Sequence, residues 1–550
     1  MDNFSGVLVP TTLEDVTTLV DMLAFRAGHT PDKEAYIFEG DSVTHRRQWD
    51  EVNRVGSCLI EHGLKPGDRA LVIIPNGTEF FPAFYGIQRA GGVAVPLFPG
   101  SGARRVLTIL SACEAKAVIV PSDTPEEVLL TYQQGVQAFG CVLLTVADCL
   151  KSEPTADFPQ VDPDDLAFLQ YTSGSTGNSK GVMLTHANLV ANLRQMVAAS
   201  LMTDNDVLVS WLPVYHDLGL ILMTMAPFYI GARLVLLPTT LTKMSRWLDA
   251  VVEYKGTYTA APDVGYRQLI KQVRDPDKYD LSTLRIAINA AEPVRAQTVY
   301  EFERMFRLPP ISKPSYGLAE ASVGVAFWGV EASPIKVDVR GNVAIGYPLP
   351  DIELKIVVDD REAAVGEVGE LVLKSPAATK GYYRNPEATE ALFWGDGYVR
   401  TGDLAYHDAD GDLFLVARKK NIIKHSGRTV APREVEELVD DVPGVRYSAA
   451  VGVDRGDLAG EQLYVFAETR LSQDRAAVEG PAYVRAIVQR LHQRLGFRPG
   501  RVILVAKHTI PFTYNGKIQH VQLKQAYVSG ELAREGKLLY PLASSETAND

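Results

Sequence analysis

Short, continuous apolar runs recur through the first half of the chain, separated by amphipathic stretches and Gly/Pro turns. Such a run is too short to form the core of a helix and is typical of a strand buried on both faces, as in a parallel sheet. The amphipathic stretch over 79–90 is typical of a helix that covers such a sheet. We therefore predict an α/β fold with mostly parallel sheets flanked by helices, with buried strands at 71–74, 93–95, 117–120, 142–144, 234–237 and 285–288.

The pattern changes beyond about residue 351 to amphipathic strands joined by loops, expected at 354–357 and 370–373. Strands with one apolar and one solvent-exposed face predict a distorted β-barrel-like subdomain. After Arg418 a compact α+β unit is expected, and 550 residues exceed what one core normally organises. We predict a large N-terminal domain over 1–417, a hinge at 418–420 and a small C-terminal domain over 421–550, whose helices and strands are expected at 434–439, 449–453, 464–467, 483–495 and 502–505.

The composition, with 46% hydrophobic and 22% charged residues, is ordinary for a soluble globular enzyme. The net charge of -12 provides no basic excess for binding a phosphate backbone, so no nucleic-acid partner is expected. Cys58, Cys113, Cys141 and Cys149 lack metal-ligand spacing and lie in or beside apolar segments, which predicts reduced core residues and a cytoplasmic location. No apolar segment approaches the length of about 20 residues that spans a membrane, so no stable membrane anchor is expected.

The segment 171–181 combines three glycines, several hydroxyl side chains and one lysine. Glycines let backbone N–H groups approach phosphate oxygens, hydroxyls add donors, and an ammonium group neutralises negative charge. The spacing differs from that of a P-loop, and the alternative is a flexible Gly/Ser linker. The apolar run before the segment and the helix start at Thr185 favour a short, anchored connection. We predict a polyphosphate-binding loop with Thr172, Ser173, Gly174, Ser175, Thr176, Gly177 and Lys180.

This loop closely resembles the phosphate-binding motif of the acyl-adenylate-forming superfamily, which includes acyl-CoA synthetases, fatty acyl-AMP ligases, luciferases and peptide-synthetase adenylation domains. Six further segments resemble the family's motifs in the family's order, at 211–219, 290–293, 315–320, 400–403, 418–424 and 513–517. The resemblance implies an enzyme that uses ATP and Mg²⁺ to join a carboxylic acid to AMP with release of pyrophosphate. A thiol then attacks the mixed anhydride, so no enzyme nucleophile is required.

Bringing a carboxylate to the α-phosphorus of ATP places two anions together, so the site must supply positive charge. The resemblance assigns the β- and γ-phosphates to the loop and both the carboxylate and the α-phosphate to Lys517. Glu320 is the expected Mg²⁺ ligand, since carboxylate oxygen suits a hard cation. The alternatives are a solvated lysine near the C-terminus and an exposed acid at a helix start.

The remaining motifs imply how the nucleotide is recognised. Tyr316, followed by Gly317, offers an aromatic face for adenine, and Asp403 accepts hydrogen bonds from the ribose hydroxyls with help from Arg418. The backbone on the other side of the base is expected at Ala291, Glu292 and Pro293. Taken singly, these residues could equally be a core tyrosine, a turn aspartate and a surface arginine.

Further residues are expected to act in the second half-reaction. His216 resembles the family's gate between the acyl pocket and the thiol tunnel, although it could be a core histidine. In the family the small C-terminal domain is a mobile lid that rotates after adenylate formation, and Lys420 occupies the hinge position. The rotation brings Lys424 and Gly427 to the thiol channel.

The acyl pocket is expected to be mainly apolar, which suits an aliphatic or other hydrophobic acid. Asp263 has no obvious amine to pair with if the substrate is a plain fatty acid, whereas Gly265 would leave depth for a chain. The residues expected to line the pocket are Trp211, Val214, Met223, Asp263, Gly265 and Leu318.

Within the superfamily the chain is most similar to fatty acyl-AMP ligases, which load an acyl group onto the phosphopantetheine thiol of an acyl carrier protein, in fatty acid metabolism or secondary metabolite biosynthesis. The similarity lies in 211–219, in 290–294 followed by 299–306, and in 460–470. Departures are Ser179, Ala290 and Ala417, and the span 316–346 is too short for the full insertion of those ligases. The alternatives are an acyl- or aryl-CoA synthetase that uses free CoA, and a non-catalytic binding protein.

Overall fold

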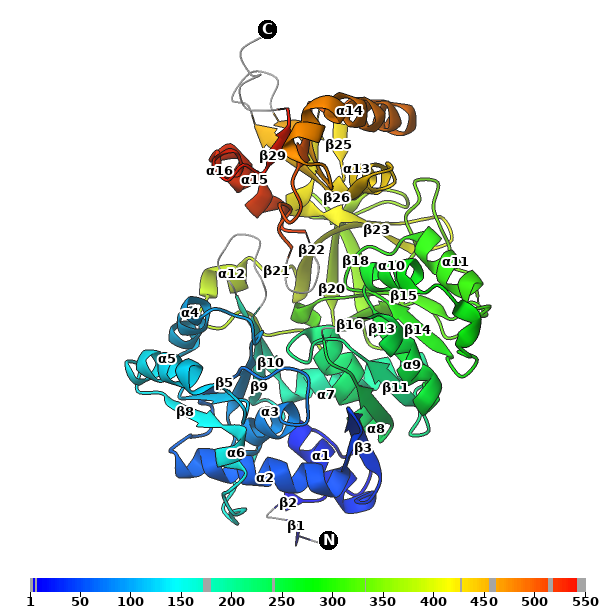
Figure 1. Ribbon diagram of the computed structural model, residues 1–550. Coiled ribbons are helices and arrows are strands. Elements are labelled where there is room, and N and C mark those ends of the chain that lie inside the picture. Colours follow the sequence, from blue (N-terminus) through cyan, green and yellow to red (C-terminus); the bar gives the residue numbers. More distant parts are fainter. Residues whose placement is uncertain are drawn as a thin grey trace.

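The computed structural model describes residues 3–4, 7–171, 180–239, 243–331, 333–425, 428–454, 461–512 and 518–541. Figure 1 shows a large lower body, coloured blue to yellow-green, with the C-terminal unit, yellow to red, above it. The N-terminal hairpin of β1 (Asn3–Phe4) and β2 (Val7–Leu8) lies at the bottom of this view.

The first sheet of the body has six strands and helices on both faces. One face packs with α2 (His45–Glu61), α3 (Phe80–Arg89) and α6 (Val146–Cys149), and the other with α4 (Ala103–Cys113) and α5 (Glu126–Gln137). All neighbours are parallel except the β9–β10 hairpin. The strand order is β10 (Gly181–Thr185), β9 (Leu166–Tyr171), β6 (Val93–Pro96), β5 (Arg69–Val72), β7 (Ala117–Val120) and β8 (Val142–Thr145).

The second sheet has nine strands, of which the inner ones are parallel. Its order is β17 (Tyr347–Pro348), β16 (Gly324–Phe327), β15 (Ser312–Gly317), β14 (Ile286–Asn289), β13 (Tyr258–Ala261), β11 (Val207–Ser210), β12 (Arg233–Leu236), β3 (Glu34–Phe38) and β4 (Asp41–Thr44). The core shared with the first sheet contains α1 (Leu19–His29), α7 (His186–Ser200), the π-helix η1 (Leu218–Met225) and α8 (Ala226–Ile230). The opposite face packs with α9 (Ser245–Tyr254), α10 (Asp263–Gln272) and α11 (Ala296–Met305).

An antiparallel sheet follows, above the two parallel-rich sheets in Figure 1. It consists of β19 (Arg361–Glu362), β18 (Glu353–Val358), β20 (Gly369–Lys374), β22 (Tyr398–His407), β21 (Phe393–Trp394) and β23 (Leu413–Arg418), with both β21 and β23 paired to β22. This curled, open sheet corresponds to the predicted barrel-like subdomain. The short helices η2 (Pro276–Lys278), η3 (Ala319–Ala321) and α12 (Pro386–Glu390) lie in connections.

The C-terminal unit begins after the 3₁₀ turn η4 (Lys419–Asn421) and has cores of its own. A four-stranded sheet, β26 (Val445–Asp454), β27 (Glu461–Thr469), β28 (Arg501–Val505) and β29 (Leu538–Tyr540), carries an apolar cluster on each face. It is accompanied by the hairpin β24 (Ile423–His425) and β25 (Arg428–Val430), and by α13 (Pro432–Asp440), α14 (Gln473–Leu495), α15 (His520–Val528) and α16 (Glu531–Arg534).

The α/β prediction is confirmed, and each predicted strand overlaps an observed strand. One local difference concerns the glycine-rich segment, which was expected to lead from a strand into a helix. The structure places strand β10 before α7, so the segment joins the two strands of a hairpin. The α7 helix starts as predicted, because the Thr185 side chain accepts from the backbone N–H of Asn188.

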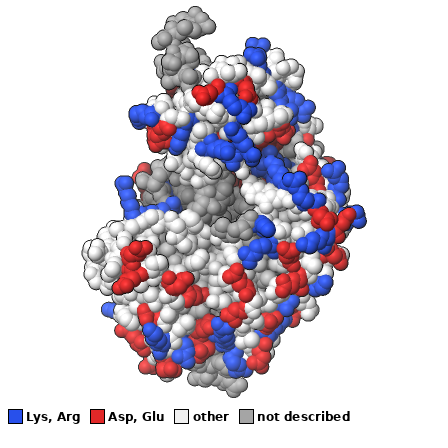
Figure 2. All heavy atoms as spheres, viewed as in Figure 1, with Lys and Arg blue, Asp and Glu red and all other residues white. Residues whose placement is uncertain are grey.

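The four cysteines are buried and free, as the sequence predicts. Among the described residues, no helix combines the length and the apolar character that crossing a membrane requires. In Figure 2, Lys and Arg side chains gather over the C-terminal unit and along its boundary with the body, although the chain as a whole carries a net charge of -12. A local excess of positive charge attracts anionic ligands to this boundary.

Candidate active site

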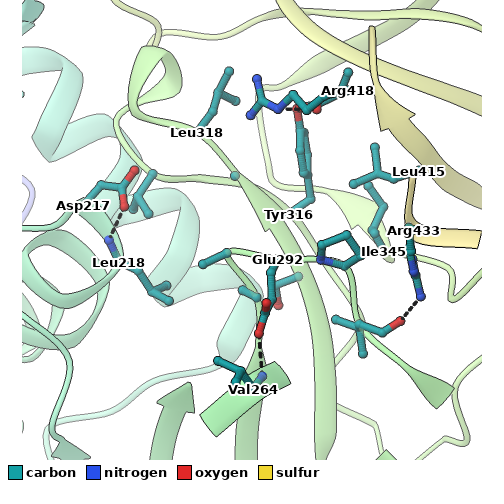
Figure 3. A pocket seen from close by; sticks show the side chains of 18 of the residues that line it. Asp217, Leu218, Val264, Glu292, Tyr316, Leu318, Ile345, Leu415, Arg418 and Arg433 are labelled. Carbon is teal, nitrogen blue, oxygen red and sulfur yellow. Dashed lines mark hydrogen bonds and ion pairs between the residues drawn. The ribbon is translucent and has the colours of Figure 1, made fainter. Parts of the chain in front are cut away.

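A cavity of about 570 Å³ lies between the carboxyl ends of the parallel strands and the C-terminal unit (Figure 3). Its volume is in the range of small-molecule sites. Glu292 and Tyr316 line it from the body, whereas Arg433 and His520 line it from the C-terminal unit. The carboxyl edge of an open parallel sheet is where α/β proteins bind ligands, because the loops that follow neighbouring strands converge there.

The residues predicted for nucleotide recognition outside the glycine-rich segment line this cavity. They are Ala291, Glu292, Pro293, Tyr316, Gly317, Asp403 and Arg418, together with Glu320, His216, Leu318 and the predicted hinge residue Lys420. Lys180 and Lys424 do not line it. Thr172, Ser173, Gly174, Ser175, Thr176, Gly177, Gly427 and Lys517 lie outside the described residues. Phe512 and Ile518, the described residues on either side of 513–517, both line the cavity.

Tyr316, Asp403 and Arg418 form one hydrogen-bonded group on the cavity wall. The Tyr316 hydroxyl donates to Asp403 Oδ2 at 2.6 Å, and Arg418 Nε lies 2.7 Å from Asp403 Oδ1. Asp403 and Arg418 are direct partners across the β22–β23 ladder, which fixes their pairing. Burial, and then the charge of Asp403, raise the pKa of Tyr316, so this phenol stays protonated and donates. Each carboxylate oxygen keeps a lone pair with which Asp403 can accept further hydrogen bonds.

Glu320 is linked to Lys180 through Tyr382, a residue that the sequence analysis did not identify. The Tyr382 hydroxyl donates to Glu320 Oε1 at 2.8 Å, and Lys180 Nζ lies 4.6 Å from the centroid of the Tyr382 ring. Burial, and then the charge of Glu320, raise the pKa of Tyr382, which therefore remains a donor. Lys180, near the end of the glycine-rich segment, and Glu320, the carboxylate predicted to hold Mg²⁺, thus both contact the Tyr382 side chain.

The segment after β14 has a constrained backbone. Ala291 has a φ of 67°, in the left-handed region that a non-glycine residue rarely adopts. The Glu292 side chain accepts from the backbone N–H of Val264, as Figure 3 shows. Burial, and then the charge of Asp263, raise the pKa of Glu292. Strain of this kind is typical of ligand-binding segments and persists because the surrounding contacts hold it.

Position 317 requires glycine because neighbouring backbone leaves no room for a Cβ. A Cβ at this position would lie 1.7 Å from the carbonyl oxygen of Val323. We expect Gly317→Ala to lower the free energy of unfolding by about 3 kcal/mol or more, because backbone must move to admit the methyl group. Thermal unfolding checks this. The matched control is Gly329→Ala, since a Cβ there meets no atom within 4 Å; equal midpoints for the two variants would contradict the expectation.

The inner part of the cavity is mainly apolar. Leu222 of η1, Met196 of α7, Ile288 of β14 and Leu318 contribute to its wall. His216 lies at the entrance to η1, and its Nδ1 is 2.6 Å from Asp217 Oδ1. The Asp217 carboxylate also accepts a hydrogen bond from the backbone N–H of Leu218. The same carboxylate therefore both orients the His216 imidazole and caps the N-terminus of η1.

Several residues predicted for the acyl pocket do not line this cavity, and the prediction is corrected for them. Val214 and Met223 are 0% exposed and pack in the apolar core instead. Trp211 packs against Trp247, with 5.8 Å between the ring centroids. Gly265 faces the same indole, and a Cβ there would lie 3.0 Å from Trp211. Gly265 therefore admits the tryptophan rather than an acyl chain.

Asp263 is also a correction, because it is a structural carboxylate. It is 1% exposed and pairs with Arg267 Nε at 2.9 Å. It also accepts from the backbone N–H of Arg295 at 3.1 Å and from the Thr298 hydroxyl at 3.2 Å. These hydrogen bonds connect the start of α10 to the start of α11. They explain why an aspartate occupies position 263 although a plain fatty acid has no amine to pair with it.

Helix α13 joins the C-terminal unit to the body through charged side chains. Arg295 Nη2 lies 3.1 Å from Asp440 Oδ2, and Arg295 Nε lies 3.6 Å from Glu437 Oε1. Arg433 Nη2 donates to the carbonyl of Val294 at 2.7 Å, as drawn in Figure 3. These contacts close one side of the cavity.

We expect Arg295→Ala to slow the acid-dependent pyrophosphate release that the sequence motifs imply about tenfold, because Asp440 loses its ion-pair partner and Glu437 keeps only Arg433, which weakens the contact between the C-terminal unit and the body. Arg304→Ala is the control, because Arg304 is exposed and lies in α11, the helix that Arg295 precedes. An unchanged rate in Arg295→Ala would show that the closure does not depend on this ion pair.

Residues 23–383 match the family described as AMP-binding enzyme. The medium-chain-fatty-acid acyl-carrier-protein ligase JamA of Moorena producens is 28% identical over 575 residues, covering 94% of this chain and 96% of JamA. A long-chain-fatty-acid CoA ligase of Salmonella typhimurium is 30% identical over 492 residues, covering 82% of this chain and 85% of that protein.

Among solved structures, one from studies of fatty acyl-adenylate ligases from E. coli and L. pneumophila superimposes with a TM-score of 0.85 and 26% identity, covering 95% of this chain and 100% of that chain. The matched family covers residues 23–383, which include Glu292, Tyr316 and Glu320 of the cavity wall, whereas Asp403 lies beyond the matched range. The chain therefore belongs to the AMP-binding enzyme family, within the acyl-adenylate-forming superfamily whose motifs its sequence carries.

Proposed function

We propose that the chain is an ATP-dependent ligase that activates a fatty acid to acyl-AMP, releases pyrophosphate and transfers the acyl group to the phosphopantetheine thiol of an acyl carrier protein. The observation that supports this best is a single cavity with two kinds of wall. Tyr316, Asp403 and Arg418 form a polar end suited to a nucleoside, and apolar side chains such as Leu222 and Met196 form an inner end suited to an alkyl chain.

In this proposal the polar end holds ATP. Tyr316 stacks on adenine, Asp403 accepts from the ribose hydroxyls, and the backbone at 291–293, strained at Ala291, lines the other side of the base. Thr172, Ser173, Gly174, Ser175, Thr176, Gly177 and Lys180 hold the β- and γ-phosphates.

Glu320 fits a hard divalent cation, because its carboxylate lines the cavity and Tyr382 orients one of its oxygens. Mg²⁺ held there would neutralise phosphate charge when bound.

The first step joins the two anions. A carboxylate oxygen of the acid attacks the α-phosphorus, and the bond from that phosphorus to the β-bridging oxygen breaks, so pyrophosphate leaves. Lys517 contacts the carboxylate and the α-phosphate in this proposal, and the flanking residues Phe512 and Ile518 support it, since both line the cavity. No proton has to be removed, because the acid is ionised at neutral pH.

The second step transfers the acyl group. The thiol sulfur bonds to the carbonyl carbon, the bond to the AMP oxygen breaks, and the thiol proton passes to solvent. The hinge at 418–420 and the lid domain over 421–550 are proposed to rotate for this step, moving Lys517 away and bringing Lys424 and Gly427 to the channel gated by His216. Burial, and then the charge of Arg418, lower the pKa of Lys420, which lies in the short turn η4.

A carrier protein and free CoA are both candidate acceptors. The likeness to JamA and to the fatty acyl-adenylate ligase structure favours the carrier protein. The Salmonella relative and the short segment between β16 and β17 favour CoA as the second candidate.

The decisive experiment measures pyrophosphate release with saturated acids of increasing length, followed by intact-mass analysis of products formed with a carrier protein and with CoA. We expect acid-dependent release and a mass gain on the carrier's phosphopantetheine. Formation of acyl-CoA alone would select the second candidate. Absence of acid-dependent release with every acid would overturn the activation step itself.

A further inference from the structure

An imidazole and a carboxylate of the C-terminal unit pair on the cavity wall, and neither has a part in the two proposed reaction steps. His520, the first residue of α15, and Glu436 of α13 both line the cavity. His520 Nε2 lies 2.7 Å from Glu436 Oε1, and the two side chains are only 16% and 12% exposed. Solvent screens such a pair less than a surface ion pair, so the contact fixes the two side chains relative to each other.

The surroundings of the His520 ring favour its doubly protonated form. Burial lowers the pKa of His520, whereas the charge of Glu436, the hydrogen bond to it and a hydrogen bond to the Ile518 backbone raise it, and the net shift is upward. A neutral imidazole has one N–H donor, and the imidazolium has two. The ring therefore connects α13 with the chain immediately before α15.

The chain before α15 is also closed by backbone contacts. The backbone N–H of Gln519 donates to the carbonyl of Pro511 at 2.9 Å. Phe512 and Ile518 form an antiparallel bridge. The described residues on either side of 513–517 are thus paired with each other, and the imidazole sets the position of this pair relative to α13.

Glu436 is itself held in place. Its Oε1 also accepts from the backbone N–H of Ala450, in β26, at 2.9 Å. Asp440 lies one turn further along α13, and its Oδ2 is 3.1 Å from Arg295 Nη2 of the body. Helix α13 therefore contacts the body at one turn and the His520 imidazole at the turn before it.

We propose that His520 is a positioning residue that, through its ion pair with Glu436, holds Lys517 in place for adenylate formation. This inference rests on the proposed function and deepens it by naming the contact through which the C-terminal unit sets the geometry of the first step. Lys517 precedes His520 by three positions in the chain. A displacement of about 1 Å at a reaction centre can lower a rate by about 10²-fold, so the anchor of this lysine matters for the rate.

The proposal separates the two half-reactions. His520 and Glu436 both belong to the unit that is proposed to rotate, so their contact is kept in both arrangements. Lys517 acts only in the first step of the proposed reaction. Loss of the ion pair therefore affects adenylate formation and leaves thioester formation unchanged.

The test measures both half-reactions of His520→Ala. Exchange of labelled pyrophosphate into ATP with a saturating fatty acid is expected to fall by about 10- to 100-fold, because Lys517 is no longer held. Thioester formation from supplied acyl-AMP is expected to stay near the wild-type rate, which also shows that the variant folds. Glu436→Gln keeps an acceptor for the Ala450 N–H and removes only the charge, so a smaller loss confined to the exchange reaction is expected.

His492→Ala is the matched control. His492 lies on α14 of the same unit, is exposed and does not line the cavity. Both half-reactions of this variant are expected to match those of the wild type.

Full exchange activity in His520→Ala overturns the proposal. An equal loss in both half-reactions also overturns it, because the ion pair then supports the fold of the C-terminal unit rather than the lysine. In a Lys517→Ala background, His520→Ala is expected to cause no further loss of exchange, and a further loss as large as that in the wild-type background would show that His520 acts independently of Lys517. These outcomes differ from failure of the proposed function, in which the wild-type protein itself shows no acid-dependent exchange.

Discussion

Lys517→Ala is expected to lower acid-dependent pyrophosphate exchange by about 10²- to 10³-fold or more while the protein still folds. The physical reason is that the ammonium group neutralises charge that two anions bring together, and removing one such donor typically has this effect. The measurement is exchange of labelled pyrophosphate into ATP with a saturating fatty acid. Thioester formation from supplied acyl-AMP is expected to remain near the wild-type rate, because the proposed rotation moves Lys517 away from that step.

Lys507→Ala is the control for this experiment, since Lys507 is exposed and lies in the same C-terminal unit. Its exchange rate is expected to match that of the wild type. Full exchange activity in Lys517→Ala would refute the role proposed for this lysine. An equal loss in both half-reactions would instead show that Lys517 does not leave the site.

Asp403→Ala is expected to lower kcat/KM for ATP by about 10²- to 10³-fold, because the two ribose hydrogen bonds that we propose for this charged acceptor would be lost together. The same change leaves Arg418 and the Tyr316 hydroxyl without their shared partner. Arg418 is partly exposed, with 42% of its side-chain surface accessible, so solvent compensates for much of this loss. We expect the free energy of unfolding to fall by only about 1–2 kcal/mol.

Tyr316→Phe separates the two effects of that substitution. It keeps the aromatic face and removes only the 2.6 Å hydrogen bond to Asp403, so a loss in kcat/KM for ATP below about tenfold is expected. Steady-state kinetics with varied ATP, together with thermal unfolding, measure both variants. A greater loss of ATP affinity in Tyr316→Phe than in Asp403→Ala would contradict the assignment of the ribose to Asp403.

The predictability of the site differs from residue to residue for physical reasons. Tyr316 and Asp403 lie 87 positions apart, and their motifs identified both before the structure showed their 2.6 Å hydrogen bond. Tyr382 lies in a loop after a turn, and no local pattern relates it to Glu320 or Lys180. Its role depends on an isolated bridge between Val182 and Tyr382 that only the folded chain forms.

The acyl pocket shows where apolar character alone is insufficient. Met223 and Leu222 are neighbours in η1, yet Leu222 lines the cavity and Met223 is buried in the core. Every residue of η1 is buried, so amphipathic periodicity cannot distinguish the face that contacts a ligand. Gly265 permits close packing of Trp211, a contact between residues on different elements that the sequence does not reveal.

The sequence by itself determined the fold class, the positions of the buried strands and the motifs of the AMP-binding enzyme family, because strand burial and turn chemistry are encoded over a few adjacent residues. Only the tertiary structure decided which side chains face the cavity and which carboxylates are structural. Asp263 is the clearest case, because its partners lie on elements far apart in the chain, so its surroundings are set by packing rather than by neighbouring sequence.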